Sequence, residues 1–229
     1  MEIKALLWNW RRKDMIGLKK SMFHLYNREQ MNKLQNFRKN FNPTSIPFRK
    51  EILSFSEEIL EKNDFPSTKN EKWKYTRLGK LSRLSLEKSN QKSSIKESSE
   101  KISEEAITVE ITNGFVTTIT ELPKGLVIKS LKDCSKKELA SLGENIHLEN
   151  EVFHCLNSLY IQDGIYIEIE KNTKLNKEIH IIYNNLSINT FNPTRLYINS
   201  KSFSEANIVE LFKSNGAENS FLNPVNEAV

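Results

Sequence analysis

The sequence predicts a mainly β protein with an α-helical N-terminal part. Three observations lead to this fold class. Apolar residues recur at helical spacing up to about residue 64, a run rich in Ser, Lys and Glu follows at 87–104, and short alternating runs typical of strands follow it. We therefore expect an N-terminal helical domain over residues 1–86 and a β domain over residues 105–229.

The helical domain is expected to contain helices separated by prolines. Residues 1–64 show helical spacing that is interrupted at Asn42-Pro43-Thr44 and again at Pro47. Asn63 and Pro66 then supply a helix end. Between these breaks, apolar residues mark one face and glutamates the other. The expected apolar face consists of Ile52, Phe55, Ile59 and Leu60.

Residues 87–104 have the composition of a mobile linker. Ile95 and Ile102 are its only large apolar residues. Such a segment cannot bury enough apolar surface to offset the entropy lost on ordering. It is therefore expected to separate the two domains.

The first part of the β domain, residues 105–130, is expected to form strands. Alternation over residues 107–111, the Asn113-Gly114 pair and a second run over 115–119 predict a β-hairpin. Residues 126–128 form another strand pattern. Residues 135–142 are typical of one short helix, with Ser135 as its cap and Gly143 at its end.

Residues 150–229 are expected to form the main β core. From Gly164 onwards, short strand patterns at 165–169, 178–183, 195–198 and 206–212 are separated by Asn, Ser and Lys turns, without helical patterns between them. This order excludes alternating βαβ units. It leaves a sandwich and a β-solenoid equally open.

Composition narrows the functional classes. The chain has 229 residues and a net charge of +5, but residues 1–50 alone carry +9, so its basic character belongs to the N-terminal part. Cys134 and Cys155 are the only cysteines, which excludes a disulfide framework and favours a cytoplasmic protein. No run approaches the ~20 apolar residues of a membrane span.

Residues 1–30 form a basic leader that contains Trp8 and Trp10. Either this leader lies on an anionic membrane surface, or it is an upstream extension from a misassigned start, with Met15, Met22 or Met31 as the true one. The second interpretation is preferred, so no stable membrane association is expected.

Two segments resemble a known family. Residues 64–78, DFPSTKNEKWKYTRL, resemble a signature near the end of the helical region in SufD members of the SufB/SufD family, which are scaffold subunits of the SUF iron–sulfur cluster assembly machinery. Residues 153–167 and 179–183 resemble the start of that family's β core. A weaker similarity covers residues 192–210, and Glu178 departs from the proline that the family often has there.

The resemblance implies a fold and a set of partners. It implies that the β core is the first part of a right-handed parallel β-helix, which pairs with SufB, and that a C-terminal helical region binds the ATPase SufC. It also implies a non-catalytic subunit that holds no cofactor of its own, while the iron–sulfur cluster is assembled transiently by the complex. The cysteine and histidine residues that the family uses have no counterparts in this sequence.

The sequence stops within a strand pattern at residues 226–229, without the polar cap that a stack of strands needs. We therefore expect a truncated chain that exposes a strand edge and self-associates.

Candidate residues for chemistry are few, and each has a structural interpretation. His154 and Cys155, as expected neighbours on a strand, would point to opposite faces and could not share a metal. Cys134 is interpreted in the same way, as a small buried apolar residue. His180 should face away from the apolar layer. Asp163-Gly164 is typical of a turn in which glycine has a positive φ. No nucleophile–base set, phosphate loop or carboxylate pair is present, so no catalytic, cofactor or metal residue is assigned.

Two other functions remain as alternatives. Trp73 and Tyr75 among basic residues could stack on nucleic acid bases, or Trp73 could anchor the helical region on the β domain, which the resemblance favours. A carbohydrate-binding or carbohydrate-active β-solenoid would need aromatic and acidic residues exposed along one face. Tyr166, Glu168 and Glu170 are the only residues that suggest it.

Overall fold

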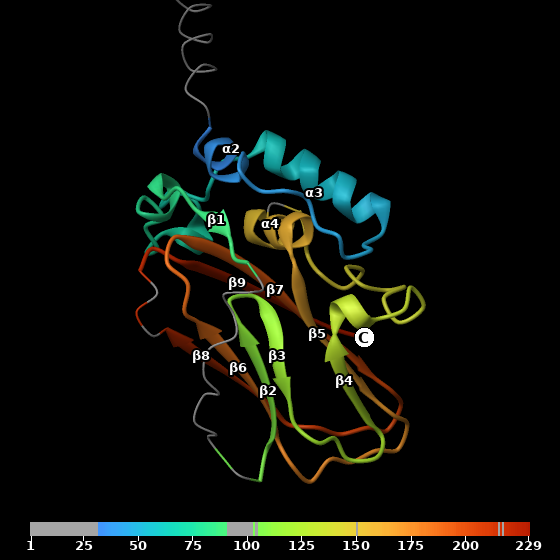
Figure 1. Cartoon of the computed structure of the whole chain (residues 1–229). Coiled ribbons are helices and arrows are strands. Elements are labelled where there is room, and N and C mark those ends of the chain that lie inside the picture. Colours follow the sequence, from blue (N-terminus) through green and yellow to red (C-terminus); the bar gives the residue numbers. More distant parts are fainter. Residues whose placement is uncertain (1–31, 91–102, 104, 150, 215, 217) are drawn as a thin grey trace, which may run out of the picture.

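The computed structural model describes residues 32–90, 103, 105–149, 151–214, 216 and 218–229. This part of the chain is a mixed α/β structure in which strands in two sheets predominate (Figure 1). The helices are α2 (Lys33–Arg38), α3 (Lys50–Lys62) and α4 (Val152–Tyr160), with short 3₁₀ turns at Glu71–Trp73, Leu81–Arg83 and Leu131–Asp133. The strands are β1 (Glu87–Lys88), β2 (Ile107–Thr112), β3 (Phe115–Ile119), β4 (Leu126–Ser130), β5 (Asp163–Ile169), β6 (Ile179–Asn185), β7 (Thr190–Ser200), β8 (Ile208–Ser214) and β9 (Phe221–Ala228).

Successive strands after β4 alternate between the two sheets. One sheet has the order β1-β7-β5-β4, with β9 also paired to β7, and the second has the order β3-β2-β6-β8. From β5 onwards, each strand pairs in parallel with the strand two places later: β5 with β7, β6 with β8, and β7 with β9. Only the β2–β3 and β4–β5 pairs are antiparallel within the described part of the chain. Chain direction is therefore uniform in the later strands.

The first core lies between the two sheets. It is built from the inward residues of β2, β4, β5 and β6, of which Val109, Ile165, Ile167 and Ile181 are fully buried. β-branched residues dominate this layer, as expected for a pleated, buried surface. Alternate residues of each strand supply it because side chains point to opposite faces in turn.

A second core joins the helices to the strands. Leu34 and Phe37 of α2 and Leu60 of α3 pack with residues of α4 and with Phe191 of β7. The ring centroids of Phe37 and Phe191 are 5.4 Å apart, edge to face. Figure 1 shows α2, α3 and α4 gathered at one end of the strands. The N-terminal helices therefore share their core with the β part.

Several expected elements are confirmed. The Asn113-Gly114 hairpin joins β2 and β3 with φ values of +50° and +88°, as the tight turn requires. The helix expected before Asn63 is α3, and Asn63 closes it by donating its backbone N–H to the Ile59 carbonyl. Its buried stripe is Ile52, Ser56 and Leu60, however, while Phe55 is 39% exposed.

Other expectations are wrong. The short helix expected at 135–142 is a series of turns: the Ser135–Glu138 cap bonds form, but continuous helical bonding does not follow. Residues 152–160, expected within the β core, form α4. Glu87 and Lys88, expected in the linker, pair with Thr190 and Phe191 as β1. The part of that linker at 91–102 and 104 and the leader at 1–30 lie outside the described residues.

None of the helices in the described part of the chain combines the length and apolar character needed to cross a bilayer.

Candidate functional site

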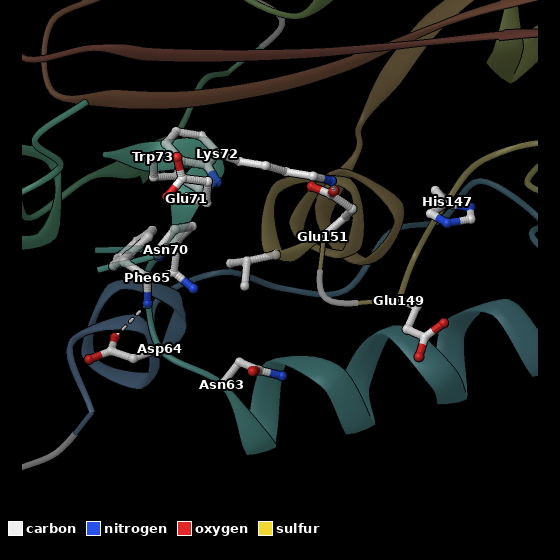
Figure 2. Close-up of a pocket in the computed structure, with 12 residues that line it drawn as sticks. Asn63, Asp64, Phe65, Asn70, Glu71, Lys72, Trp73, His147, Glu149 and Glu151 are labelled. Atoms are coloured by element: carbon white, nitrogen blue, oxygen red, sulfur yellow. Dashed lines mark hydrogen bonds and ion pairs between the residues drawn. The ribbon is translucent and has the colours of Figure 1, made fainter. Parts of the chain in front are cut away.

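A broad groove lies between the segment that follows α3 and the segment that leads into α4. One wall is formed by residues 63–66 and 70–73, between α3 and the end of the first 3₁₀ turn, and the other by His147, Glu149, Glu151 and Val152, at and before the start of α4. Its volume is about 730 Å³. Figure 2 shows the side chains of both walls around this space. The groove therefore occupies the junction between the helical part and α4.

Local hydrogen bonds hold the first wall in place. Asp64 Oδ1 accepts the backbone N–H groups of Leu34, at 2.9 Å, and of Phe65, at 2.8 Å. Asn32 Nδ2 donates to the Asn63 carbonyl at 2.8 Å. The Leu34 N–H is thus shared between Asp64 and the N-cap side chain of Asn32, and the Asp64 carboxylate ties the bend after α3 to the start of α2.

Aromatic contact and an ion pair hold the two walls together. The ring of Trp73 lies 5.1 Å from that of Phe153 in α4. Lys72 extends toward Glu151 (Figure 2), with Nζ 2.6 Å from Oε1. Trp73 is therefore a packing anchor between the helical part and the β domain.

The groove carries an excess of carboxylates. Asp64, Glu71, Glu149 and Glu151 line it, against Lys72 as the one Lys or Arg among its described lining residues. His147 also lines it, and its carbonyl contacts His154 Nδ1 at 2.6 Å. Such a surface suits a basic or amide-rich partner surface better than a nucleic acid.

Tyr75 and Lys74, which the nucleic-acid hypothesis also invoked, do not line the groove. Tyr75 is 91% exposed and stacks on no other ring in the described structure, with Lys74 Nζ 5.6 Å from its centroid. Trp73 and Tyr75 therefore do not form one stacking surface.

One wall of this groove overlaps the sequence signature at residues 64–78, and a family model supplies the decisive comparison. The model described as SufBD protein N-terminal region matches residues 18–181. This match covers more than half of the chain. The chain belongs to the SufB/SufD family. The comparison with curated proteins gives no match.

The SufB/SufD match begins earlier than the motifs that predicted it. Those motifs start at residue 64, whereas the family region starts at residue 18 and so includes part of the basic leader. It ends within β6, at residue 181.

The two cysteines of this SufB/SufD chain are held as thiols. Burial raises the pKa of Cys134 to about 12 and that of Cys155 to about 11. Cys155 is fully buried in the helix–strand core, and its Sγ lies 3.5 Å from the Leu148 carbonyl. His154 and Cys155 lie on α4 and not on a strand, so the expectation that they point to opposite faces of a strand is wrong. They still differ in environment, since His154 is partly exposed at the helix surface.

His180 faces away from the apolar layer, as expected, and is buried between neighbouring strands. It lies on β6, faces away from the core between the sheets and is 5% exposed. Its Nε2 contacts Glu178 Oε2 at 2.9 Å, while its Nδ1 has no hydrogen-bond partner in the described structure. Among the described residues, no three His, Cys, Asp or Glu side chains gather closely enough to hold a metal ion.

Asp163-Gly164 begins β5 and is not a turn. Gly164 has no positive φ; a Cβ there would lie 2.2 Å from the Arg195 carbonyl oxygen, so the glycine is required by the close approach of β7. Asp163 is buried and accepts hydrogen bonds from Ser130 Oγ and from the Gly164 and Val116 N–H groups. Burial nevertheless raises its pKa.

The face expected of a carbohydrate site is absent from β5. Tyr166 is buried at 0% exposure and donates its hydroxyl to Glu168 Oε2 at 2.6 Å. The pKa of Tyr166 is raised mainly by its burial and, to a smaller extent, by its hydrogen bond to Glu168. An aromatic ring enclosed in the core cannot stack on a sugar, so β5 does not present the exposed row that this alternative needs.

Sequence reasoning missed a buried polar network around Arg195 on β7. Arg195 and Glu227 of β9 are both fully buried at their side chains, 3.3 Å apart. Arg195 also donates to Asn157 Oδ1 and Ser158 Oγ of α4, and its guanidinium lies 4.9 Å from the Phe48 ring. Glu227 accepts the Gly143 N–H at 2.8 Å. Burial lowers the pKa of Arg195 while Glu227 raises it, and a guanidinium stays charged in either case.

This network links four parts of the chain that are remote in sequence. The Asn157 amide also donates to the carbonyls of Thr194 and Asn223, which ties α4 to both β7 and β9. No local signal predicts it, because the residues that bond to one another are more than 30 positions apart and each looks ordinary in its own segment.

Proposed function

We propose that this chain is a SufD-type scaffold subunit, without catalytic activity of its own, that pairs with SufB through strands of its β part. A region C-terminal to residue 229 would bind the ATPase SufC, and the iron–sulfur cluster would be cargo of the complex. The observation that carries the proposal is the family match together with the strand order. Strands that alternate between two sheets and pair in parallel two places on are the pattern expected of a right-handed parallel β-helix.

Two edge strands support pairing with another subunit. β8 pairs only with β6 and β9 only with β7 in the described sheets. Phe212 on β8 is 56% exposed and stacks on the ring of Tyr183, with centroids 4.7 Å apart. An edge with free backbone groups and an exposed ring is suited to strand addition.

The state of the thiols supports a role without a resident cluster. The thiolate is the form that binds metals, and burial holds both cysteines as thiols near neutral pH. We place the protein in the cytoplasm because a pair of free, reduced thiols suits a reducing compartment.

Co-expression with SufB and SufC of the same source tests the proposal. The full reading frame carries an affinity tag, and the eluate is analysed by size-exclusion chromatography with light scattering. A complex that contains SufB is expected. In a second arm SufB is replaced by a SufD of the same source, and recovery with that SufD but not with SufB would show that the family is right and the branch wrong. Failure to bind either would overturn the scaffold role.

Matched variants locate the pairing surface. Phe212→Lys on β8 is expected to reduce SufB recovery at least tenfold, because a charge is placed on the pairing edge. Phe203→Lys, at a residue 79% exposed outside the strands, serves as control and should leave recovery unchanged. Equal recovery with both variants would exclude β8 as the surface.

A further inference from the structure

A second pocket lies on another side of the α4 region and has a different character from the carboxylate-rich groove. Its volume is about 460 Å³. It is lined by parts of the loop before α3, by the end of β1, by the start of β3 and by the loop before β5. The lining residues are Asn42, Pro43, Ser45, Lys88, Ser89, Asn90, Phe115, Lys132, Ile161 and Gln162. This described lining contains two lysines and neither Asp nor Glu.

Lys88 is a half-buried cation without a charged partner among the described residues. Its Nζ donates to the backbone carbonyl of Asn42 and lies 5.6 Å from the centroid of the Tyr160 ring. A carbonyl and an aromatic face stabilise an ammonium, but neither neutralises it. Burial accordingly lowers the pKa of Lys88 to about 8. The pairing of β1 with β7 fixes its position, since Lys88 lies opposite Phe191.

Lys132 supplies the second positive charge from the opposite part of the lining. Its Nζ lies 4.4 Å from the centroid of the Phe115 ring. The carboxylate that it influences is Asp163. Asp163 is outside the lining, and its oxygens already accept from Ser130 Oγ at 2.5 Å and from the Gly164 N–H at 2.8 Å. That carboxylate therefore serves the start of β5 and leaves the pocket positive.

Hydrogen-bonding groups complete the lining. Gln162 contributes an amide and Ser45 a hydroxyl. The Ser89 hydroxyl donates its proton to Asn192 Oδ1 at 2.6 Å, so the Ser89 oxygen can accept a further hydrogen bond but cannot donate one. Polar donors beside two ammonium groups and an aromatic wall match an anion that carries a small organic part.

We propose that this pocket binds a small phosphate-bearing molecule, with Lys88 and Lys132 as its cationic contacts. A phosphate monoester carries about −1.5 to −2 charges near neutral pH, which is the charge needed to balance two lysines. A carboxylate would balance only one of them. The volume holds more than the phosphate group alone, so the ester part would lie against Phe115.

Direct binding to inorganic phosphate tests the proposal. Isothermal titration and NMR spectra of the full chain are recorded with phosphate, with acetate and with chloride at one ionic strength. Phosphate is expected to bind, and acetate and chloride are not. Lys88→Gln and Lys132→Gln should each weaken phosphate binding about tenfold or more, while Lys174→Gln, an exposed lysine paired with Glu205, should not change it. Lys132→Arg keeps the charge and should keep binding.

Selective labelling gives an independent measurement. Pyridoxal 5′-phosphate condenses with a neutral lysine amine to an imine with loss of water, and borohydride then delivers hydride to give a stable secondary amine. Mass spectrometry should locate the label at Lys88, and inorganic phosphate should protect it. Labelling spread over exposed lysines without protection would contradict the site.

Other outcomes overturn the proposal outright. Equal phosphate binding by the Gln variants and the wild type would show that these lysines form no site. Co-sedimentation with phosphatidylglycerol vesicles but no response to free phosphate would assign the charge to a lipid surface instead. If Lys88→Gln fails to fold, as judged by its melting curve, the exposed Lys132→Gln variant still decides the question.

Discussion

At the scale of single residues, we expect Arg195 to make a large contribution to stability. It is fully buried together with Glu227. Arg195→Met would leave that carboxylate buried opposite an apolar side chain, with backbone N–H donors as its remaining contacts. Removal of one partner of a buried ion pair costs about 3–5 kcal/mol. We expect a loss of that size in the free energy of unfolding, measured by urea titration.

The control for this prediction is an exposed ion pair. Lys174→Met breaks the contact with Glu205, in which both side chains are more than half exposed. It should cost less than about 1 kcal/mol. Arg195→Met combined with Glu227→Gln should recover part of the loss, because the buried charge is gone. A change below about 1 kcal/mol for Arg195→Met alone would contradict the role given to the network.

The ion pair between Glu138 and Lys129 predicts that the free energy of unfolding depends on pH. Lys129 Nζ, 2.7 Å from Oε1, and the Ser135 N–H and hydroxyl lower the pKa of Glu138 from 4.5 to about 2. Since the pKa is lower in the folded chain, the stabilisation is complete above pH 4.5 and is lost as the pH falls through about 2. Glu138→Gln should therefore cost about 0.5–1 kcal/mol at pH 7. In urea titrations repeated from pH 7 to about pH 2, the two stabilities should converge as the pH falls below the ordinary glutamate pKa; a constant difference would refute the ion-pair origin.

At the scale of the elements, the contact between β5 and β7 depends on one glycine. A Cβ at Gly164 would approach the backbone of Arg195 to 2.2 Å. Because backbone atoms cannot move aside without breaking the parallel ladder, Gly164→Ala should destabilise by about 3 kcal/mol or more. Gly79→Ala is the matched control, since its added methyl group would meet only the end of the Arg83 side chain, at 3.5 Å. Thermal melts of both variants check this prediction. A fall in Tm for Gly164→Ala but not for Gly79→Ala shows that the loss comes from the contact between β5 and β7 and not from alanine in general.

The segment that carries the family signature is expected to act through one of its two aromatic residues. Trp73→Ala removes the contact with Phe153 and should cost about 1–2 kcal/mol. Tyr75→Ala alters a ring that is 91% exposed and should change stability by less than about 0.5 kcal/mol. Denaturant titration checks both values. A larger loss for Tyr75 than for Trp73 would revive the interpretation of this segment as a stacking surface.

Strands were predicted better than the helix among them. The sequence located β3 at 115–119, and β5, β6 and β8 closely, because alternation and an Asn-Gly turn are local signals. α4 was missed although Val152, Leu156 and Leu159 recur at helical spacing, because a helix of nine residues gives this period few turns in which to show. The turns at 135–142 satisfy a cap pattern without continuing into a helix.

The groove was only partly predictable for a similar reason. The signature predicted that Trp73 anchors one part on another, but its partner lies on the unpredicted α4. The phosphate pocket and the Arg195 network combine residues from segments far apart in the sequence. Their assembly depends on strand register, which local patterns do not contain.

At the scale of the whole molecule, the free edges of the two sheets predict association between copies of the chain. β8 and β9 each have one free side in the described sheets, and Phe212 is exposed there. We expect the 229-residue chain to self-associate, with a mass by light scattering that rises with concentration. Phe212→Lys should shift it toward the monomer. A monodisperse wild-type monomer across the concentration range would contradict this expectation.

The parallel pairing also imposes an order on biosynthesis. Asp163 pairs with Thr194, 31 positions later, and Phe191 with Phe221, 30 positions later. A nascent chain can therefore add each strand as soon as about thirty more residues leave the ribosome. The N-terminal helices behave differently, because Phe37 of α2 packs against Phe191 and Phe221. During synthesis α2 must therefore remain without these neighbours until β9 has emerged, and its apolar face stays uncovered for that interval.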